Sequence, residues 1–217
     1  MIALLCSATM AFAYEAKIDG IYYDFDHENK TAGVTSGYTD YYGNIIIPEK
    51  VTYNGIEYTV TFIGENAFRG CSGLTSIEIP NSVTSIGERA FYGCYSLDTL
   101  ICEFGDDVEF YDDNEGGHSF AGIKNLRYFE GPAKLVNTIS EEFQTQFSNK
   151  LTEVHITDGE LDENGFNYIN RSKKSLHTID LAGTTNTAIN DLAFYDCYKL
   201  ENLMLLGNLE TIGFKAV

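Results

Sequence analysis

The feature that most constrains the fold is an internal sequence repeat, whose first two copies are 23 residues apart. The segment Ile63–Ile77 (IGENAFRGCSGLTSI) aligns without a gap with Ile86–Leu100 (IGERAFYGCYSLDTL), and a third good copy spans Ile189–Leu203 (INDLAFYDCYKLENL). Between the second and third copies, only an apolar triplet persists. The leading leucines mark six rungs, at Leu74, Leu97, Leu126, Leu151, Leu176 and Leu200. A unit this short cannot bury its apolar face alone, so we expect the copies to stack as a solenoid.

Each rung has a shape that can be predicted from its residues. Apolar alternation from Ile77 predicts a short strand that ends at Pro80, and the β-branched segment 83–86 predicts a second short strand. Residues 65–68 suit one or two helical turns with an exit at Gly70. The sequence therefore predicts a mainly β repeat solenoid with parallel strands and short helical turns.

The motif I-G-x-x-A-F-x-G-C-x-x-L-x-x-I-x-I-P resembles the BspA-like (Treponema-type) leucine-rich repeat family. The match is close at residues 62–100 and 188–205, partial at 119–130, and reduced to a leucine skeleton at 140–182, where insertions could be accommodated. The resemblance implies a right-handed leucine-rich repeat coil over residues 62–217. It also implies a β-rich N-terminal cap over residues 14–61, where Asn54-Gly55 predicts a hairpin turn.

The two ends of the chain carry further expectations. Residues 1–13 contain a short apolar run followed by Ala11-Phe12-Ala13, which predicts a secretory signal peptide cleaved after Ala13, although no Lys or Arg precedes Lys17. A lipoprotein anchored through Cys6 is the alternative. A further copy begins at Ile212 and stops inside its helical turn, so we expect the array to be truncated at its C-terminal end.

Charge and hydropathy exclude several classes of partner. The chain has 32 acidic and 14 basic residues and a net charge of −18, which argues against a nucleic-acid partner or an anionic membrane surface bound through bulk electrostatics. The N-terminal apolar run is shorter than the roughly 20 residues that span a bilayer, so we expect no integral membrane span.

Candidate catalytic and metal-binding residues do not form a recognisable pattern. Cys71, Cys94 and Cys197 share one repeat position, for which free buried thiols are favoured over a disulfide or a metal role. The acidic stretch 105–118 lacks EF-hand spacing. The four histidines, which lack metal-ligand spacing, are His27, His118, His155 and His177. We therefore predict no catalytic residues, no cofactor and no metal, and a protein that is not an enzyme.

Two surfaces are candidates for binding. Positions between the inward residues of each strand must face outward, which predicts one continuous sheet face. Its residues are Ser76, Glu78, Thr99, Ile101, Tyr128, Glu130, Glu153, His155, Thr178, Asp180, Asn202 and Met204. A second candidate is an edge of recurring tyrosines in the turns, formed by Tyr92, Tyr95, Tyr195 and Tyr198.

The function expected from the family resemblance is adhesion. It implies a secreted or cell-surface bacterial protein that binds extracellular proteins of a host, including matrix proteins, or components of neighbouring cells. The alternative is a carbohydrate-binding accessory module of a bacterial surface system, because exposed aromatic side chains can contact sugars as well as proteins.

Overall fold

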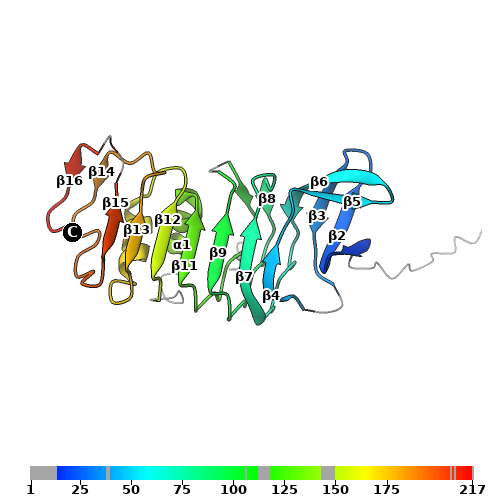
Figure 1. Cartoon of the computed structure of the whole chain (residues 1–217), viewed down its shortest axis with the longest axis horizontal. Helices are drawn as coiled ribbons and strands as arrows, with labels where there is room; N and C mark the ends of the chain where they lie inside the picture. Colours follow the sequence, from blue (N-terminus) through cyan, green and yellow to red (C-terminus); the bar gives the residue numbers. More distant parts are fainter. Residues whose placement is uncertain are drawn as a thin grey trace, which may run out of the picture.

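The computed structural model describes residues 14–37, 40–105, 107–111, 118–142, 150–205, 207 and 209–216, without the side chains at 139–142 and 164. Seven parallel strands lie side by side along the molecule as one sheet (Figure 1). In spatial order they are β4 (Tyr42–Ile46), β7 (Gly73–Ile79), β9 (Thr99–Cys102), β11 (Tyr128–Gly131), β12 (Glu153–Ile156), β13 (Thr178–Asp180) and β15 (Asn202–Met204). The predicted repeat solenoid is confirmed.

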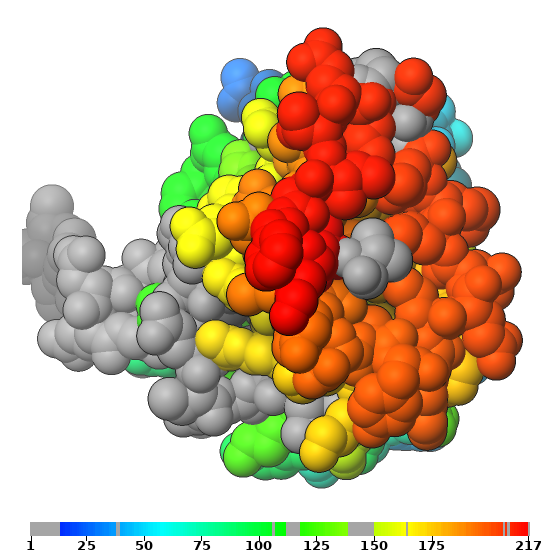
Figure 2. All heavy atoms as spheres, turned by 90° about the vertical axis from the view of Figure 1, so that its left-hand side faces the viewer, coloured from blue at the N-terminus to red at the C-terminus, as the bar shows by residue number. Residues whose placement is uncertain are grey.

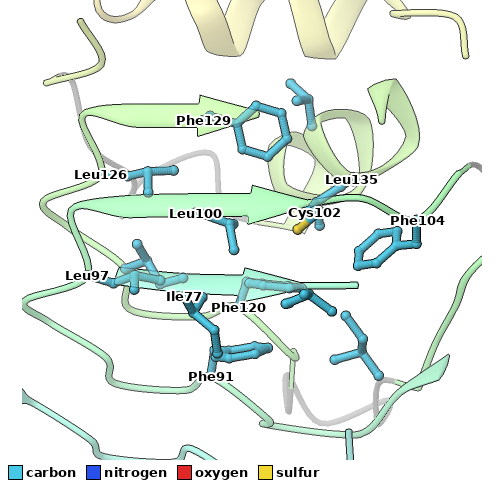
Figure 3. Close-up of a cluster of buried hydrophobic side chains, with 14 of the residues drawn as sticks. Ile77, Phe91, Leu97, Leu100, Cys102, Phe104, Phe120, Leu126, Phe129 and Leu135 are labelled. Atoms are coloured by element: carbon cyan, nitrogen blue, oxygen red, sulfur yellow. The ribbon is translucent and has the colours of Figure 1, made fainter. Parts of the chain in front are cut away.

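The strand register confirms the column of apolar side chains expected from the leucine spacing. Ile77 pairs with Leu100, Leu100 with Phe129, and the same column continues through Val154, Ile179 and Leu203. The leading leucines of the first five rungs are buried, and Leu200 in the last rung packs partly buried against them. Figure 3 shows Ile77, Leu100 and Phe129 from three of these strands in one cluster with Phe91 and Phe120 of the turns and Leu135 of the opposite wall.

A second wall closes the back of the coil. The predicted strand at 83–86 is present as β8 (Ser85–Ile86), which pairs in parallel with β10 (Glu109–Phe110). At the C-terminal end, β14 (Ala188–Ile189) pairs with β16 (Thr211–Ile212). Figure 2 views this end, with the last described residues in red at the front.

Two helices replace the back strands in the third and fourth rungs. These are α1 (Ala133–Glu142) and α2 (Glu163–Asn170), which pack against each other. Asp162 caps α2, because its side chain accepts a hydrogen bond of 2.7 Å from the Gly165 amide. Both helices lie where the repeat consensus is weakest. Their residues Leu135, Val136 and Phe166 fill the core in place of strand residues.

Polar side chains bridge the rungs across this helical part of the wall. Asn137 donates to the Glu160 carbonyl at 2.8 Å and accepts from the Asp162 amide at 3.2 Å. One rung further on, the Asn186 side chain binds both backbone groups of Leu161, at 2.8 and 2.9 Å. These bonds satisfy backbone groups that no neighbouring strand reaches.

The turns before the sheet strands differ from the predicted helical turns. Residues 65–70 form consecutive turns in which Asn66 has a φ of 56°, and the equivalent Arg89 and Leu192 also have positive φ values of 53° and 59°. A residue in the left-handed region interrupts a helix, so the backbone instead bonds to the next rung. Phe68 thus donates to the Ala90 carbonyl at 2.7 Å, and the Phe68, Phe91 and Phe120 rings stack at 4.9 Å.

The N-terminal segment is rich in strands, as expected. It contains β1 (Ala16–Ile18), β2 (Ile21–Asp26), β3 (Thr31–Val34), β5 (Lys50–Tyr53) and β6 (Ile56–Ile63). The Asn54-Gly55 hairpin is confirmed, because β5 and β6 pair antiparallel around it. β4 from the same segment joins the solenoid sheet beside β7, so the cap boundary at residue 61 stays a prediction.

Other predictions fall on residues outside this description. The signal peptide and Cys6 lie in residues 1–13, and half of the acidic stretch 105–118 lies at 106 and 112–117. Within the described part of the chain, neither helix has the length and apolar character needed to cross a bilayer.

Candidate binding surfaces

The twelve outward positions expected from the sequence form two adjacent columns, which we call the strand face. The first column runs through Ser76, Thr99, Tyr128, Glu153, Thr178 and Asn202, and the second through Glu78, Ile101, Glu130, His155, Asp180 and Met204. Parallel pairing in register places equal repeat positions opposite each other, so six rungs make one continuous surface. Its use in binding stays a prediction.

The structure extends this face by one strand at its N-terminal end. Asn44 and Ile46 of β4 pair with Ser76 and Glu78, and the Thr75 hydroxyl donates to the Asn44 side chain at 3.0 Å. Tyr42 and Ile46 are 78% and 66% exposed. The sequence analysis missed this strand because Ile45, Ile46 and Ile47 were interpreted as part of the cap.

The middle of the strand face holds interacting side chains that we call the central cluster: Tyr128, Glu130, Glu153, His155 and Asp180. The Tyr128 hydroxyl donates a 2.6 Å hydrogen bond to Glu130, and the Tyr128 and His155 rings lie 5.4 Å apart. The His155 ring nitrogens lie 3.6 Å from an Asp180 oxygen and 3.8 Å from a Glu153 oxygen. Each side chain is thus oriented by a neighbour.

The electrostatics of the strand face are acidic. Its two columns contain four carboxylates and neither lysine nor arginine. Partial burial raises the pKa of Tyr128 above its ordinary value, and the hydrogen bond to Glu130 and the negative charges of Glu130 and Glu153 raise it further. Tyr128 therefore stays a neutral hydroxyl at physiological pH.

A third outward column was missed by the sequence analysis. It lies one residue before the strand-face columns, at Thr75, Asp98, Arg127, Thr152, His177 and Glu201, all exposed or half-buried. Arg127 pairs with Asp98 at 2.6 Å across the rungs. The leucine motif contained the signal, because two positions separate the first leucine from the next inward residue and both are outside the core.

The four edge tyrosines are exposed, but they do not form one surface. Tyr92 and Tyr95 lie in the turn before β9, whereas Tyr195 and Tyr198 lie in the turn before β15, with β11, β12 and β13 in between. Cationic groups lie over three of the rings, with Arg69 at 5.9 Å from Tyr92, Lys124 at 5.4 Å from Tyr95 and Lys215 at 5.6 Å from Tyr195. The predicted edge is therefore two separate tyrosine pairs.

The described cysteines pack in or against the core as free thiols. Cys71, Cys94 and Cys102 are buried free thiols, and Cys197 is half-buried. Burial raises the pKa of the Cys197 thiol to about 11, and the buried Cys94 thiol donates to the Phe68 carbonyl at 3.2 Å. Among the described side chains, no three His, Cys, Asp or Glu residues are grouped so as to hold a metal ion.

Comparison with known proteins gives a match along most of the chain. Residues 44–172 and 115–217 match the sequence model of the BspA type leucine rich repeat region, in six copies. No curated protein matches the chain significantly.

Solved structures of bacterial leucine-rich repeat proteins are also similar. A leucine rich cell surface protein from Faecalibacterium prausnitzii has 22% identity and a TM-score of 0.42, with 93% of this chain and 51% of that chain covered. The leucine rich repeat protein of T. pallidum has 19% identity and a TM-score of 0.41, with 92% and 86% covered. This chain therefore spans about half the length of the Faecalibacterium chain.

Proposed function

Because the chain belongs to the BspA-type leucine-rich repeat family, we propose that it is a secreted or cell-surface bacterial protein that works by binding other proteins, not by catalysis. The stacked scaffold supports this role, since repeat solenoids present extended surfaces that no local core requires. The apolar run and small residues at 1–13 support export of the chain.

The observation that carries the proposal is the central cluster on the strand face. Tyr128 combines an aromatic ring with a fixed hydroxyl, a combination typical of residues that dominate binding energy at interfaces. Its hydrogen bond to Glu130 and its contact with His155 hold the ring in place before a partner arrives, which reduces the entropy lost on binding.

The charge of the same face indicates the chemistry of the partner. Carboxylates of Glu78, Glu130, Glu153 and Asp180 line up with neither lysine nor arginine in their columns. Complementary charge both accelerates encounter and selects between partners, so a basic protein surface fits best. We propose extracellular proteins of a host or of neighbouring cells, including matrix proteins, as the class of ligand.

The proposal is tested with a panel of purified matrix proteins of high and low isoelectric point. For a bound protein, Tyr128→Ala combined with Glu153→Lys should weaken binding at least tenfold, or about 1.4 kcal/mol. Tyr111→Ala with Glu160→Lys is the matched control, because both residues are exposed away from the strand face. Equal losses in the two double variants, or no binding across the panel, would contradict the proposal.

The carbohydrate-binding alternative is distinguished in the same experiment. A glycan array probed beside the protein panel separates the two classes of ligand. Glycan binding that disappears in the Tyr128→Ala and Glu153→Lys double variant would assign the strand face to sugars instead of proteins.

A further inference from the structure

Basic side chains of this acidic protein gather along one edge of the solenoid. Seven of the 14 lysines and arginines lie in the turns that lead into four consecutive sheet strands, β11, β12, β13 and β15. We call them the basic row: Lys124, Arg127, Lys150, Arg171, Lys173, Lys174 and Lys199. In a chain with a net charge of −18, this concentration of positive charge is a local reversal of sign.

Backbone pairing keeps these turns in line. The Thr152 amide donates to the Arg127 carbonyl at 2.8 Å, and the His177 amide donates to the Thr152 carbonyl at 2.9 Å. The same ladder continues in the next rung, where the Glu201 amide donates to the His177 carbonyl at 2.9 Å. The turns therefore repeat at the spacing of neighbouring strands, and the basic side chains of successive rungs lie along the same edge.

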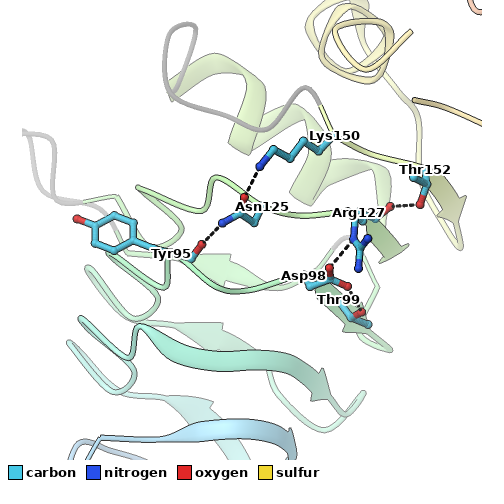
Figure 4. A network of polar contacts seen from close by, with 7 residues as sticks. All are labelled: Tyr95, Asp98, Thr99, Asn125, Arg127, Lys150 and Thr152. Atoms are coloured by element: carbon cyan, nitrogen blue, oxygen red, sulfur yellow. Dashed lines mark hydrogen bonds and ion pairs between the residues drawn. The ribbon is translucent and has the colours of Figure 1, made fainter. Parts of the chain in front are cut away.

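Side-chain bonds connect the row to the first tyrosine pair. Lys150 donates to the Asn125 side chain at 2.5 Å, and Asn125 donates to the Tyr95 carbonyl at 2.6 Å. Figure 4 shows this chain of contacts, with Arg127 beside it bound to Asp98. Tyr198, which is 69% exposed, stands beside Lys199 at the other end of the row. From Tyr95 to Tyr198 the row crosses four strand spacings, about 19 Å.

Among the described residues, the ion pairs of this row are formed with Asp98 and Asp196. Asp98 pairs with Arg127 and Asp196 pairs with Lys173, at 2.6 and 3.7 Å. Within the described part of the chain, no ion pair involves Lys124, Arg171, Lys174 or Lys199, and all four are exposed. A purely structural role would not need four exposed cations that form no ion pair with the described residues of a chain this rich in Asp and Glu.

We propose that the basic row binds a linear anionic polysaccharide, carrying sulfate or carboxylate groups, that lies along the solenoid axis across the turns. A linear polymer with a repeating charge matches cations that recur on successive turns along one edge, and several weak contacts along one chain add up through their high effective concentration. The exposed ring of Tyr198 offers an apolar platform for a sugar ring at one end. This site is separate from the strand face and goes beyond the protein binding proposed above.

The acidic strand face meets this row at Arg127. The Glu153 amide donates to the Arg127 carbonyl at 3.1 Å, so Glu153 stands beside Arg127, which is already paired with Asp98. Lys124 and Lys174 stand six positions before the strand-face carboxylates of their own rungs, outside the strands. A polyanion on the turn edge therefore contacts the lysines of the row away from the acidic columns.

A nucleic acid fits this edge less well than a glycan. Single strands bind proteins through successive bases stacked on successive aromatic rings. Here the middle of the row carries lysines and arginines, and the Tyr95 ring is already paired with Lys124 at 5.4 Å. A short oligonucleotide is therefore one arm of the test.

The test measures binding of the 217-residue chain to labelled heparin and to polygalacturonate, with neutral dextran and oligo(dT) as comparisons. We expect both anionic glycans to bind, dextran not to bind, and affinity to fall as salt increases. Lys124→Glu with Lys174→Glu should weaken glycan binding at least tenfold. Lys30→Glu with Lys50→Glu changes the net charge equally but lies in the N-terminal segment, with Lys30 in the turn before β3 and Lys50 in β5, and should change affinity less than twofold.

Lysine acetylation followed by mass spectrometry gives a second readout that needs no variant. Bound glycan should protect Lys124, Lys174 and Lys199 from acetylation and leave Lys30 reactive. The proposal is overturned if neither anionic glycan binds, if both double variants lose affinity equally, or if the protected lysines lie elsewhere. Tighter binding of oligo(dT) than of either glycan would overturn the assignment to a polysaccharide.

Discussion

The ring of Tyr128 on β11 lies 5.4 Å from the ring of His155 on β12, centroid to centroid, with the ring planes inclined at 31°. The contact joins two rungs on the solvent-facing side of the sheet, opposite the side that packs on the core. It places an aromatic ring and an imidazole between the carboxylates of Glu130, Glu153 and Asp180. The central cluster is therefore held together by contacts between strands as well as within them.

Removal of the Tyr128 hydroxyl should reduce stability at neutral pH and change its dependence on alkaline pH. Tyr128→Phe loses the hydrogen bond to Glu130, which we expect to cost about 0.5–1.5 kcal/mol. Because the folded protein raises the pKa of Tyr128, the unfolded chain ionises first, and the stability contribution present below pH 10 is lost above it. Urea unfolding at pH 7 to 11 should therefore show the wild type losing stability faster than the variant above pH 10. Parallel curves would contradict this expectation.

Relief of backbone strain at Leu192 should stabilise the protein. Leu192 has a φ of 59° and a half-exposed side chain, whereas the equivalent position in the first copy is Asn66. Asparagine tolerates the left-handed region better than leucine, for which it costs about 1–2 kcal/mol. Leu192→Asn should raise the free energy of unfolding by about 0.5–1 kcal/mol, and Asn66→Leu should lower it. Thermal and urea unfolding of both variants checks the two signs, and equal signs would refute the explanation.

The Asn186 side chain should be essential to the stability of the contact between the fourth and fifth rungs. It is buried and binds the amide and the carbonyl of Leu161. Asn186→Ala leaves these groups without their partner, at about 1–3 kcal/mol each. Asn202→Ala, at an exposed position of β15, is the control and should change stability by less than about 0.5 kcal/mol. Hydrogen exchange of the Leu161 amide should accelerate only in the Asn186 variant, and unchanged exchange would show that the contact does not depend on it.

The sequence could predict the strand face because its register follows from a single spacing. Each leading leucine precedes the next inward residue by three positions, and a slip by one residue would turn that residue to solvent. The pairing of Phe129 with Val154 and Ile179 was therefore predictable even where the consensus is weak. The pairing of β4 with β7 was not predictable, because the consensus motif begins only at Ile63 and the residues of β4 carry none of it.

Neither the helices nor the basic row could be predicted from the sequence, and the reasons differ. In α1, Leu135 and Val136 satisfy the core as well as strand residues would, so apolar content did not distinguish the two structures. The basic residues stand at different positions relative to the leading leucine, with Lys124 two positions and Lys150 one position before it and Arg127 one position after it. An alignment of the copies therefore shows no basic column, although the turns bring these side chains to one edge.

The two walls of the coil differ in how they resist bending. The front is an unbroken ladder of seven strands, whereas the back has strand pairing at each end and packed helices with asparagine bridges between them. Backbone ladders resist changes in strand spacing along their whole length, but side-chain bridges allow rotation about a few bonds. Bending of the molecule should therefore open and close the back at α1 and α2, with the front sheet as the fixed side. A ligand on the strand face would then contact a surface of nearly constant length, whose curvature depends on the packing of α1 and α2 in the back wall.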